Sequence, residues 1–111
     1  MVMNFDEYQK GSKKTAIYPK KNKYIYTTLG LLGEAGEIAE KMKRIYRGED
    51  DGKITEQRKQ AIAKEIGDLL WYLNQLATEL NLSVNDIAED NLKKLFSRKR
   101  RGKIKGDGDN R

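Results

Sequence analysis

Four carboxylates in this sequence are spaced so that two helices would bring them together. Glu34 and Glu37 lie three residues apart, and Glu65 and Asp68 repeat that spacing further along the chain. Residues at this spacing share one face of an α-helix. If the two helices fold back antiparallel, the four carboxylates converge on one point. Oxygen ligands in this number suit a hard divalent cation, Mg²⁺ or alternatively Mn²⁺.

The composition narrows the chemistry of such a site. The sequence contains no histidine and no cysteine, which argues against zinc, copper, disulfides and thiol nucleophiles. Catalysis must therefore use carboxylates, metal-bound water, lysine, tyrosine or hydroxyl groups.

Surface ion pairs are the alternative interpretation of these acids. Glu37 is one turn from Lys41, and Asp68 is one turn from Lys64, so each acid has a cation at the spacing of a common helix-surface pair. Two acid pairs on consecutive helices, each enclosing a glycine, favour the metal site instead. Four carboxylates brought together without a cation would repel one another or raise a pKa.

Length and composition predict one helical domain. The chain has 111 residues, of which 36% are charged and 37% hydrophobic, with one proline. We expect a single all-α domain over residues 1–111. The longest uncharged runs have ten residues, against about 20 for a membrane span, so we expect no membrane helix. Without a basic-then-apolar leader pattern, the expected location is cytoplasmic.

Periodicity and capping residues divide the chain into helices. The pattern predicts a short N-terminal helix over residues 4–16 and two long helices that carry the acids, over residues 24–47 and 55–80. It also predicts a fourth helix over residues 84–98 and a basic tail or closing loop over residues 98–111. The expected architecture is therefore four-helix-bundle-like.

Apolar residues at spacings of three and four predict the faces that form the core. The predicted core positions are Thr28, Leu31, Ala35, Ile38, Met42 and Ile45 on the second helix, Ile62, Ile66, Leu69, Leu70, Leu73, Ala77 and Leu80 on the third, and Val84, Ile87, Ala88, Leu92 and Leu95 on the fourth. Gly30, Gly33 and Gly36 each cost about 1 kcal/mol in a helix. We expect another backbone to approach closely there.

Other polar and aromatic residues are candidates for substrate contacts. Tyr72 lies one turn beyond Asp68, either beside the metal or as part of the core. Asn91, Lys94 and Arg98 share one side of the fourth helix, where they would suit phosphate oxygens or form a solvated basic face.

The net charge of +6 is concentrated near the C-terminus. From Lys93 onward there are nine Lys and Arg against two Asp, and residues 1–92 have a net charge of −1. Such a segment also suits a nucleic-acid-binding module. Only Phe96 is interleaved with the basic residues, so no stacking surface is present, and we expect no nucleic-acid partner.

Three segments together resemble a known superfamily. They are Gly30-Leu-Leu-Gly-Glu-Ala-Gly-Glu-Ile-Ala-Glu40, Lys64-Glu-Ile-Gly-Asp-Leu-Leu-Trp-Tyr-Leu73 and Asn91-Leu-Lys-Lys-Leu-Phe-Ser-Arg98. In this order they resemble the MazG-like all-α nucleoside triphosphate pyrophosphohydrolases. The resemblance implies a Mg²⁺-dependent enzyme in which water attacks a nucleoside triphosphate between the α and β phosphates. The products would be a monophosphate and pyrophosphate, and the expected role is the house-cleaning of unwanted nucleotides.

The resemblance also assigns roles to residues and partners. It implies that Glu34, Glu37, Glu65 and Asp68 are metal ligands and that Glu34 or Glu37 activates the water. It further implies substrate contacts from Tyr72, Asn91, Lys94 and Arg98, a base pocket that includes Gln9 and Tyr18, and a homodimer or homotetramer. The alternatives are a phosphoribosyl-ATP pyrophosphohydrolase on the same scaffold and a non-catalytic helical nucleic-acid-binding module.

Overall fold

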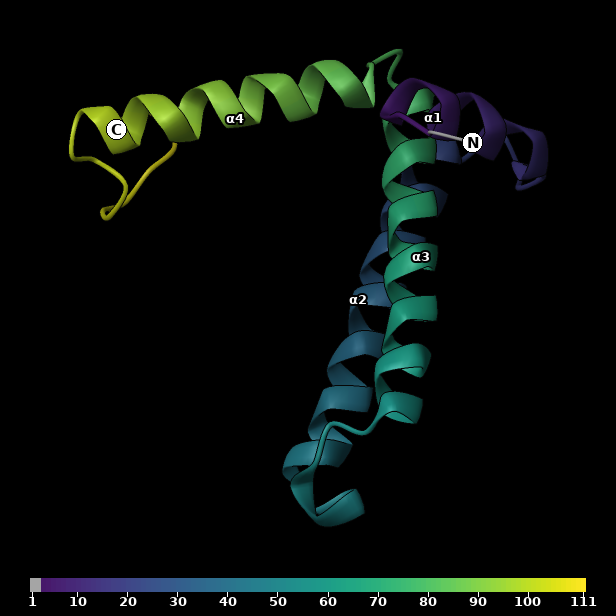
Figure 1. The fold of residues 1–111 in the computed structure, drawn as a ribbon. Helices are drawn as coiled ribbons and strands as arrows, with labels where there is room; N and C mark the ends of the chain where they lie inside the picture. The colour runs from purple at the N-terminus through teal and green to yellow at the C-terminus, as the bar shows by residue number, and fades with distance from the viewer. Residues whose placement is uncertain (1–2) are drawn as a thin grey trace.

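The computed structural model describes residues 3–111, and all the regular elements within that range are helices, which confirms the all-α prediction. Their order is α1 (Phe5–Ser12), a 3₁₀ turn η1 (Lys13–Thr15), α2 (Lys23–Tyr46), a second 3₁₀ turn η2 (Glu49–Gly52), α3 (Glu56–Glu79) and α4 (Val84–Arg100) (Figure 1).

Side-chain caps fix where three of these helices begin. Asn4 Oδ1 accepts from the backbone N–H of Glu7 at 2.8 Å, and Thr55 Oγ1 accepts from Arg58 N–H at 3.2 Å. Ser83 Oγ accepts from the Asp86 N–H at 3.1 Å. Each cap satisfies a backbone donor that has no partner inside its helix.

Helices α2 and α3 form a long antiparallel hairpin that carries the acid pairs (Figure 1). The chain reverses between them at Gly48, whose φ of 107° favours glycine, followed by Asp50 and Asp51, which are also left-handed. An ion pair of 2.6 Å from Arg58 Nε to Asp50 Oδ2 joins the turn to the first part of α3.

The buried faces of the hairpin differ from the predicted apolar stripes. On α2, Ile45 is buried as predicted, but Thr28 is exposed and Thr27 is fully buried instead. Thr27 is accommodated because its hydroxyl donates to the carbonyl of Lys23 at 2.8 Å. On α3, Ile62 and Ala77 are buried as predicted, whereas Ile66, Leu73 and Leu80 are exposed. The fully buried α3 side chains are the amides Asn74 and Gln75, which an apolar pattern does not reveal.

Helix α1 lies against α3 and connects it to α4. The Gln9 amide nitrogen donates to Thr78 Oγ1 at 3.0 Å and to the Leu82 carbonyl at 2.8 Å, and its oxygen accepts from the Val84 N–H at 2.9 Å. One side chain thus fixes α1, the end of α3 and the start of α4 relative to one another.

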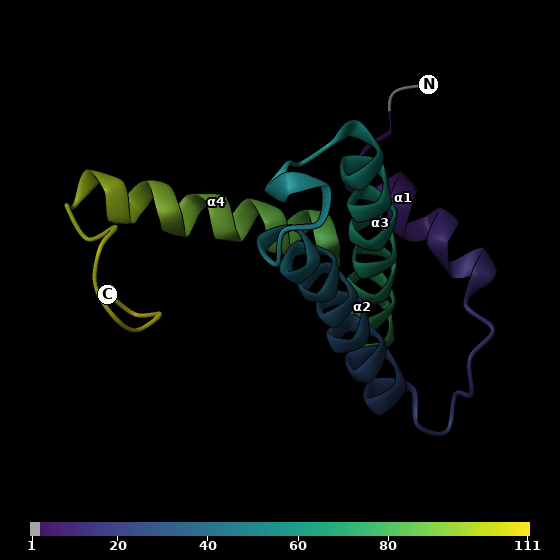
Figure 2. The same ribbon diagram turned by 90° about the horizontal axis from the view of Figure 1, so that it is seen from below.

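Helix α4 extends away from the hairpin, on the side opposite to α1 (Figures 1 and 2). Its predicted core residues Ile87, Leu92 and Leu95 are 46%, 51% and 36% exposed, and Phe96 is 54% exposed. The expectation that this face packs in the core is wrong for a single chain, because the short 80–83 connection directs α4 outward. One chain therefore does not enclose all four helices around one core.

The segment after α4 folds back on itself. The Arg111 guanidinium donates to the carbonyls of Lys103, Ile104 and Gly108 at 3.0, 3.1 and 2.5 Å. Gly102, Gly106 and Gly108 have positive φ, which permits the sharp turns between those carbonyls. Within the part of the chain that the structure describes, no helix is both long and apolar enough to cross a membrane.

Candidate metal centre

Three of the four predicted ligands meet on the hairpin. Glu34 on α2 and Glu65 and Asp68 on α3 each place one carboxylate oxygen within 4.8 Å of the others. Glu34 and Glu65 are half-buried, and Asp68 is exposed. We refer to these three residues as the acid cluster. Its members come from both helices of the hairpin. Glu65 and Asp68 lie one turn apart on α3 and face Glu34 of α2 across the interface.

Glu37 lies outside the acid cluster. It is exposed on α2, and its negative charge is the smallest of the contributions that raise the pKa of Glu34. Its roles as a fourth metal ligand and as a catalytic residue stay predictions.

Glu34 is the most perturbed member of the acid cluster. Its pKa is raised to about 7, first by a hydrogen bond with the Glu65 side chain, then by burial, and then by the charges of Asp68, Glu65 and Glu37. One of its oxygens, Oε2, is buried and has no hydrogen-bond partner in residues 3–111. A carboxylate in this position holds a proton near neutral pH unless a cation replaces it.

The ion pairs of the alternative interpretation are absent from residues 3–111. Lys41 pairs with Glu65 across the hairpin at 3.7 Å, not with Glu37, and no pair joins Asp68 to Lys64. Lys41 brings a single positive charge to one edge of a cluster of three acids.

These observations fit a divalent cation. The donor set consists of carboxylate oxygens, which Mg²⁺ and Mn²⁺ prefer. The buried oxygen of Glu34 lacks a partner, and a cation would supply one. Glu34, Glu65 and Asp68 are therefore the residues that would hold the metal.

Four aromatic side chains form a cluster beside the acid cluster. Tyr18 stacks on Tyr26 with ring centroids 5.2 Å apart, and it meets the edge of Trp71 at 6.2 Å. Trp71 meets Tyr72 edge-on at 5.0 Å and donates through its indole nitrogen to Thr15 Oγ1 at 2.9 Å. We refer to Tyr18, Tyr26, Trp71 and Tyr72 as the aromatic cluster.

Tyr72 connects the two clusters. The pKa of its hydroxyl is raised by burial first, then by Tyr26 and the charges of Glu34 and Asp68, so the hydroxyl lies within the electric field of the acids. Tyr26 was not among the predicted site residues. Its position one turn before Gly30 and two turns before Glu34 on the same helix could have identified it as a neighbour of the site.

Tyr18 and Gln9, expected in a base pocket, hold elements together in this structure. The Tyr18 hydroxyl donates to Glu79 Oε1 at 2.5 Å, and Lys20 Nζ pairs with the same oxygen at 2.9 Å. Burial and this acceptor raise the pKa of Tyr18. The side-chain amide of Gln9 donates to Thr78 of α3 and accepts from the Val84 N–H of α4, so both of its ends are bonded to these helices.

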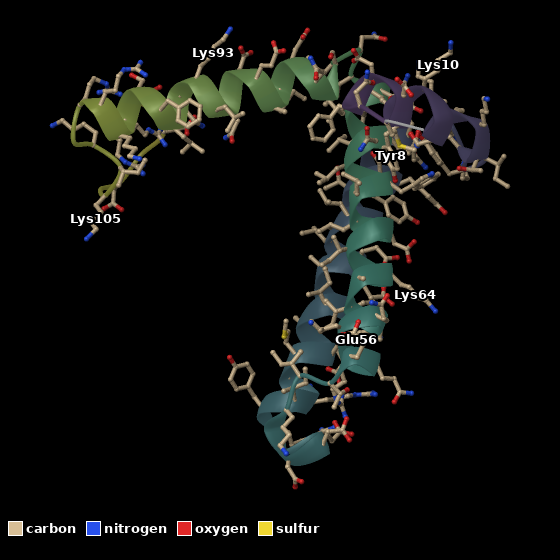
Figure 3. All side chains as sticks on the ribbon, viewed as in Figure 1. Tyr8, Lys10, Glu56, Lys64, Lys93 and Lys105 are labelled. Atoms are coloured by element: carbon tan, nitrogen blue, oxygen red, sulfur yellow. The ribbon has the colours of Figure 1, made fainter. Side chains whose placement is uncertain are left out.

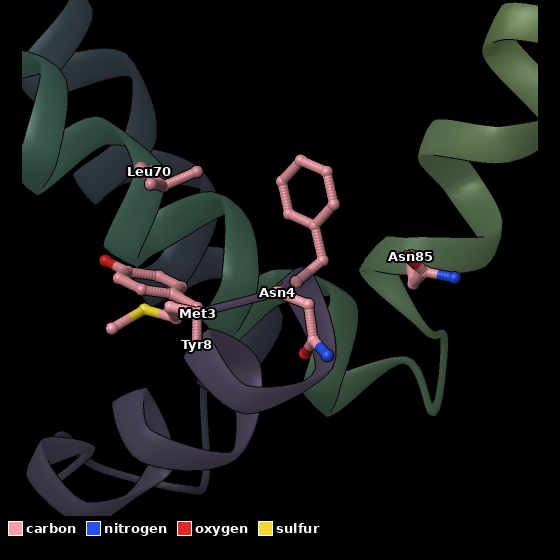
Figure 4. A pocket seen from close by; sticks show the side chains of 6 residues that line it. Met3, Asn4, Tyr8, Leu70 and Asn85 are labelled. Atoms are coloured by element: carbon pink, nitrogen blue, oxygen red, sulfur yellow. The ribbon is translucent and has the colours of Figure 1, made fainter. Parts of the chain in front are cut away.

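A cavity of about 300 Å³ lies where α1, α3 and the start of α4 meet (Figure 4). Its lining residues are Met3, Asn4, Phe5, Tyr8, Leu70 and Asn85. Tyr8 links it to the acid cluster, because burial and then the charge of Asp68 raise the pKa of the Tyr8 hydroxyl. None of the lining residues was a predicted site residue, because the cavity forms between three helices and no single helix pattern defines it.

The predicted phosphate-binding residues lie on α4, away from the acid cluster of the same chain. Figure 3 shows Lys93 on this projecting helix and Tyr8 beside α3. Lys94 Nζ lies 2.8 Å from Asp109 Oδ1, and Arg98 Nη2 lies 3.2 Å from the same oxygen and also donates to the Asp109 carbonyl. The Arg98 side chain is only 5% exposed. Asn91 is exposed.

Fold and site define a class of protein: an all-helical domain whose antiparallel hairpin presents clustered carboxylates. Comparison with known families identifies that class. The family model of the MazG nucleotide pyrophosphohydrolase domain matches residues 23–102, so the chain belongs to this family. It is also 45% identical, over 115 aligned residues, to the Gene 37 protein of Mycobacterium phage L5, covering 98% of this chain and all of that protein. No solved structure matches the chain significantly.

Proposed function

We propose that this protein is a divalent-metal-dependent nucleoside triphosphate pyrophosphohydrolase, with Mg²⁺ as its ordinary metal. The reaction adds water across the bond between the α and β phosphates and gives a nucleoside monophosphate and pyrophosphate. The observation that carries the proposal is the meeting of three carboxylate oxygens within 4.8 Å in a MazG domain.

A bound cation would neutralise phosphate charge and lower the pKa of water at the site. The chain contributes the rest. Glu65 and Asp68 supply carboxylate oxygens for the cation, and Glu34, whose pKa is raised to about 7, would release its proton when the cation binds. We propose that Glu37, an exposed residue one turn after Glu34 on α2, accepts a proton from water.

We propose that the nucleoside end of the substrate enters the cavity beside Tyr8. The walls formed by Phe5, Tyr8 and Leu70 suit a flat base, and the amides of Asn4 and Asn85 can pair with its polar edge. Leu70 of the cavity wall lies two residues after Asp68 on α3, and the Asp68 charge raises the pKa of the Tyr8 hydroxyl, so the phosphates of a nucleotide in this cavity would lie toward the acid cluster.

We also propose that the active form is a homo-oligomer in which a second copy covers α4. The accessible surface is 8504 Å², whereas a compact chain of this mass exposes about 6,300 Å². The radius of gyration is 17.2 Å, compared with about 13 Å for a compact domain of this length. The excess surface includes the exposed apolar residues of α4 and also Ile25, Leu29 and Leu32 of α2. A second copy would bury both faces.

The deciding experiment measures product formation from canonical and modified nucleoside triphosphates with Mg²⁺. Release of pyrophosphate and monophosphate in equal amounts, lost in Asp68→Asn, is the expected result. Glu40→Gln is the matched control, because Glu40 is an acid of α2 whose ion pairs within residues 3–111 are with Lys43 and Arg44. Release of orthophosphate instead, or equal activity in Asp68→Asn and Glu40→Gln, would refute the proposed reaction.

A further inference from the structure

The aromatic ring of Tyr72 occupies the space where a side chain of Gly30 would stand. A Cβ atom built on Gly30 would lie 2.1 Å from Cε1, 2.4 Å from Cδ1 and 2.5 Å from Cζ of Tyr72. These distances are far below van der Waals contact. The ring can therefore lie against α2 only because residue 30 has no side chain.

The other glycines of α2 have no such role in this chain. A Cβ on Gly33 or Gly36 would meet nothing within 4 Å in residues 3–111. The sequence-based expectation of a close backbone at all three glycines is wrong in two ways. The close approach occurs at Gly30 alone, and the approaching group is a side chain from α3.

The contact between Gly30 and Tyr72 lies one helical turn away from the acid cluster along the hairpin, so each forms one layer of the α2–α3 interface. Gly30 is one turn before Glu34 on α2, and Tyr72 is one turn after Asp68 on α3, so in the antiparallel hairpin the two layers are adjacent. Tyr72 also packs against Trp71 in a T-shaped pair, with ring centroids 5.0 Å apart. The neighbouring Glu34 Oε2 is excluded from water.

We propose that Gly30 is a positioning residue for the metal site: by admitting the Tyr72 ring against α2, it closes one side of the acid cluster and sets the position of the Glu34 carboxylate. The proposal rests on the proposed function for the identity of the metal site, whereas its test measures metal binding and stability and needs no enzymatic activity. A methyl group at position 30 forces the ring outward, and water and Glu34 then share the space that the ring leaves.

The experiment compares Gly30→Ala with Gly33→Ala in the full-length protein and uses Mn²⁺ alone as the probe. Alanine at an unobstructed helix position stabilises by about 1 kcal/mol, so Gly33→Ala should raise the midpoint temperature of unfolding by about 5 °C. Gly30→Ala should lower it and should weaken Mn²⁺ binding about tenfold, whereas Gly33→Ala should bind Mn²⁺ within about twofold of the parent.

A double-mutant cycle with Tyr72→Ala keeps the proposal testable if Gly30→Ala folds poorly. Once the ring is removed, alanine at position 30 should no longer lower the unfolding midpoint. An equal effect of Gly30→Ala with and without Tyr72, or Mn²⁺ affinity as high as in Gly33→Ala, would overturn the proposal. Weakened Mn²⁺ binding in Gly30→Ala, with no nucleotide hydrolysed by the parent, would leave the positioning role intact and refute the proposed reaction instead.

Discussion

Helices α2 and α3 bring carboxylates from both helices together, whereas α4 keeps its cationic side chains away from that cluster. In the hairpin, three carboxylate oxygens lie within 4.8 Å of one another, and Tyr72 of the aromatic cluster lies close enough for the charges of Glu34 and Asp68 to raise its pKa. On α4, Lys94 and Arg98 are paired with an acid from the chain's own C-terminal segment, and the apolar residues face outward.

The difference shows which part of the site one chain can organise. The metal-binding half depends on contacts within a hairpin, and these form as soon as its two helices pair. In the proposed homo-oligomer, a second copy would supply the surface against which Lys94 and Arg98 of α4 are placed. We therefore expect changes in the hairpin to act on chemistry and changes in α4 to act first on assembly.

The largest effect is expected within the hairpin. Glu34→Gln should lower the rate of pyrophosphate release at least about 100-fold, because a lost ligand removes several kcal/mol of electrostatic stabilisation. Steady-state kinetics with Mg²⁺ measures this. Glu37→Gln in parallel tests the predicted fourth ligand. If Glu37→Gln has the same rate as the parent, the prediction that Glu37 is a metal ligand and a catalytic residue is wrong.

The next effect belongs to α4. Leu92→Glu places a charge in the exposed apolar face, so oligomers should dissociate and activity should fall with them. Sedimentation velocity at micromolar concentration gives the assembly state. Lys93→Glu is the control on another side of the same helix, and it should remain assembled although it changes the net charge by two units instead of one. A parent protein that sediments as a monomer would refute the proposed homo-oligomer.

A smaller effect concerns pH. The folded pKa of Glu34, about 7, lies above its ordinary value of 4.5. Between these values the folded state binds more protons, so metal-free stability should be full below pH 4.5 and decrease as pH rises through 7. After allowance for solvent screening the loss is about 1 kcal/mol. Chemical denaturation at pH 5 and pH 8 measures it. Saturating Mg²⁺ or Glu34→Gln should abolish the pH dependence, and a persisting dependence in Glu34→Gln would assign it to another group.

The smallest effect is expected at the end of the chain. Asp109 is 76% exposed at its side chain, so solvent screens its ion pairs and Asp109→Asn should leave the midpoint temperature of unfolding close to that of the parent. Asp107→Asn is the matched control, with the same loss of charge from the same segment. Thermal unfolding of both variants measures the difference. A clearly lower midpoint for Asp109→Asn than for Asp107→Asn would mean that this segment contributes to the fold.

Much of the architecture could be predicted from local sequence. The caps at Asn4, Thr55 and Ser83 lie at the expected helix starts, because a capping hydrogen bond involves residues only three positions apart. The spacing of Glu34, Glu65 and Asp68 likewise depends only on helical geometry and on the short reversal between α2 and α3. The family also follows from these motifs.

Tertiary structure decided the rest. Only the packed hairpin shows that Gly30 receives the Tyr72 ring, that Asn74 and Gln75 are buried, and that Lys41 pairs with Glu65. Periodicity identified an apolar face on α4 but not its direction, which depends on four residues after α3 and on the contacts of Gln9. The physical reason is the range of the interactions. Helices and caps depend on neighbours in sequence, whereas burial and partner choice depend on residues that only the fold brings together.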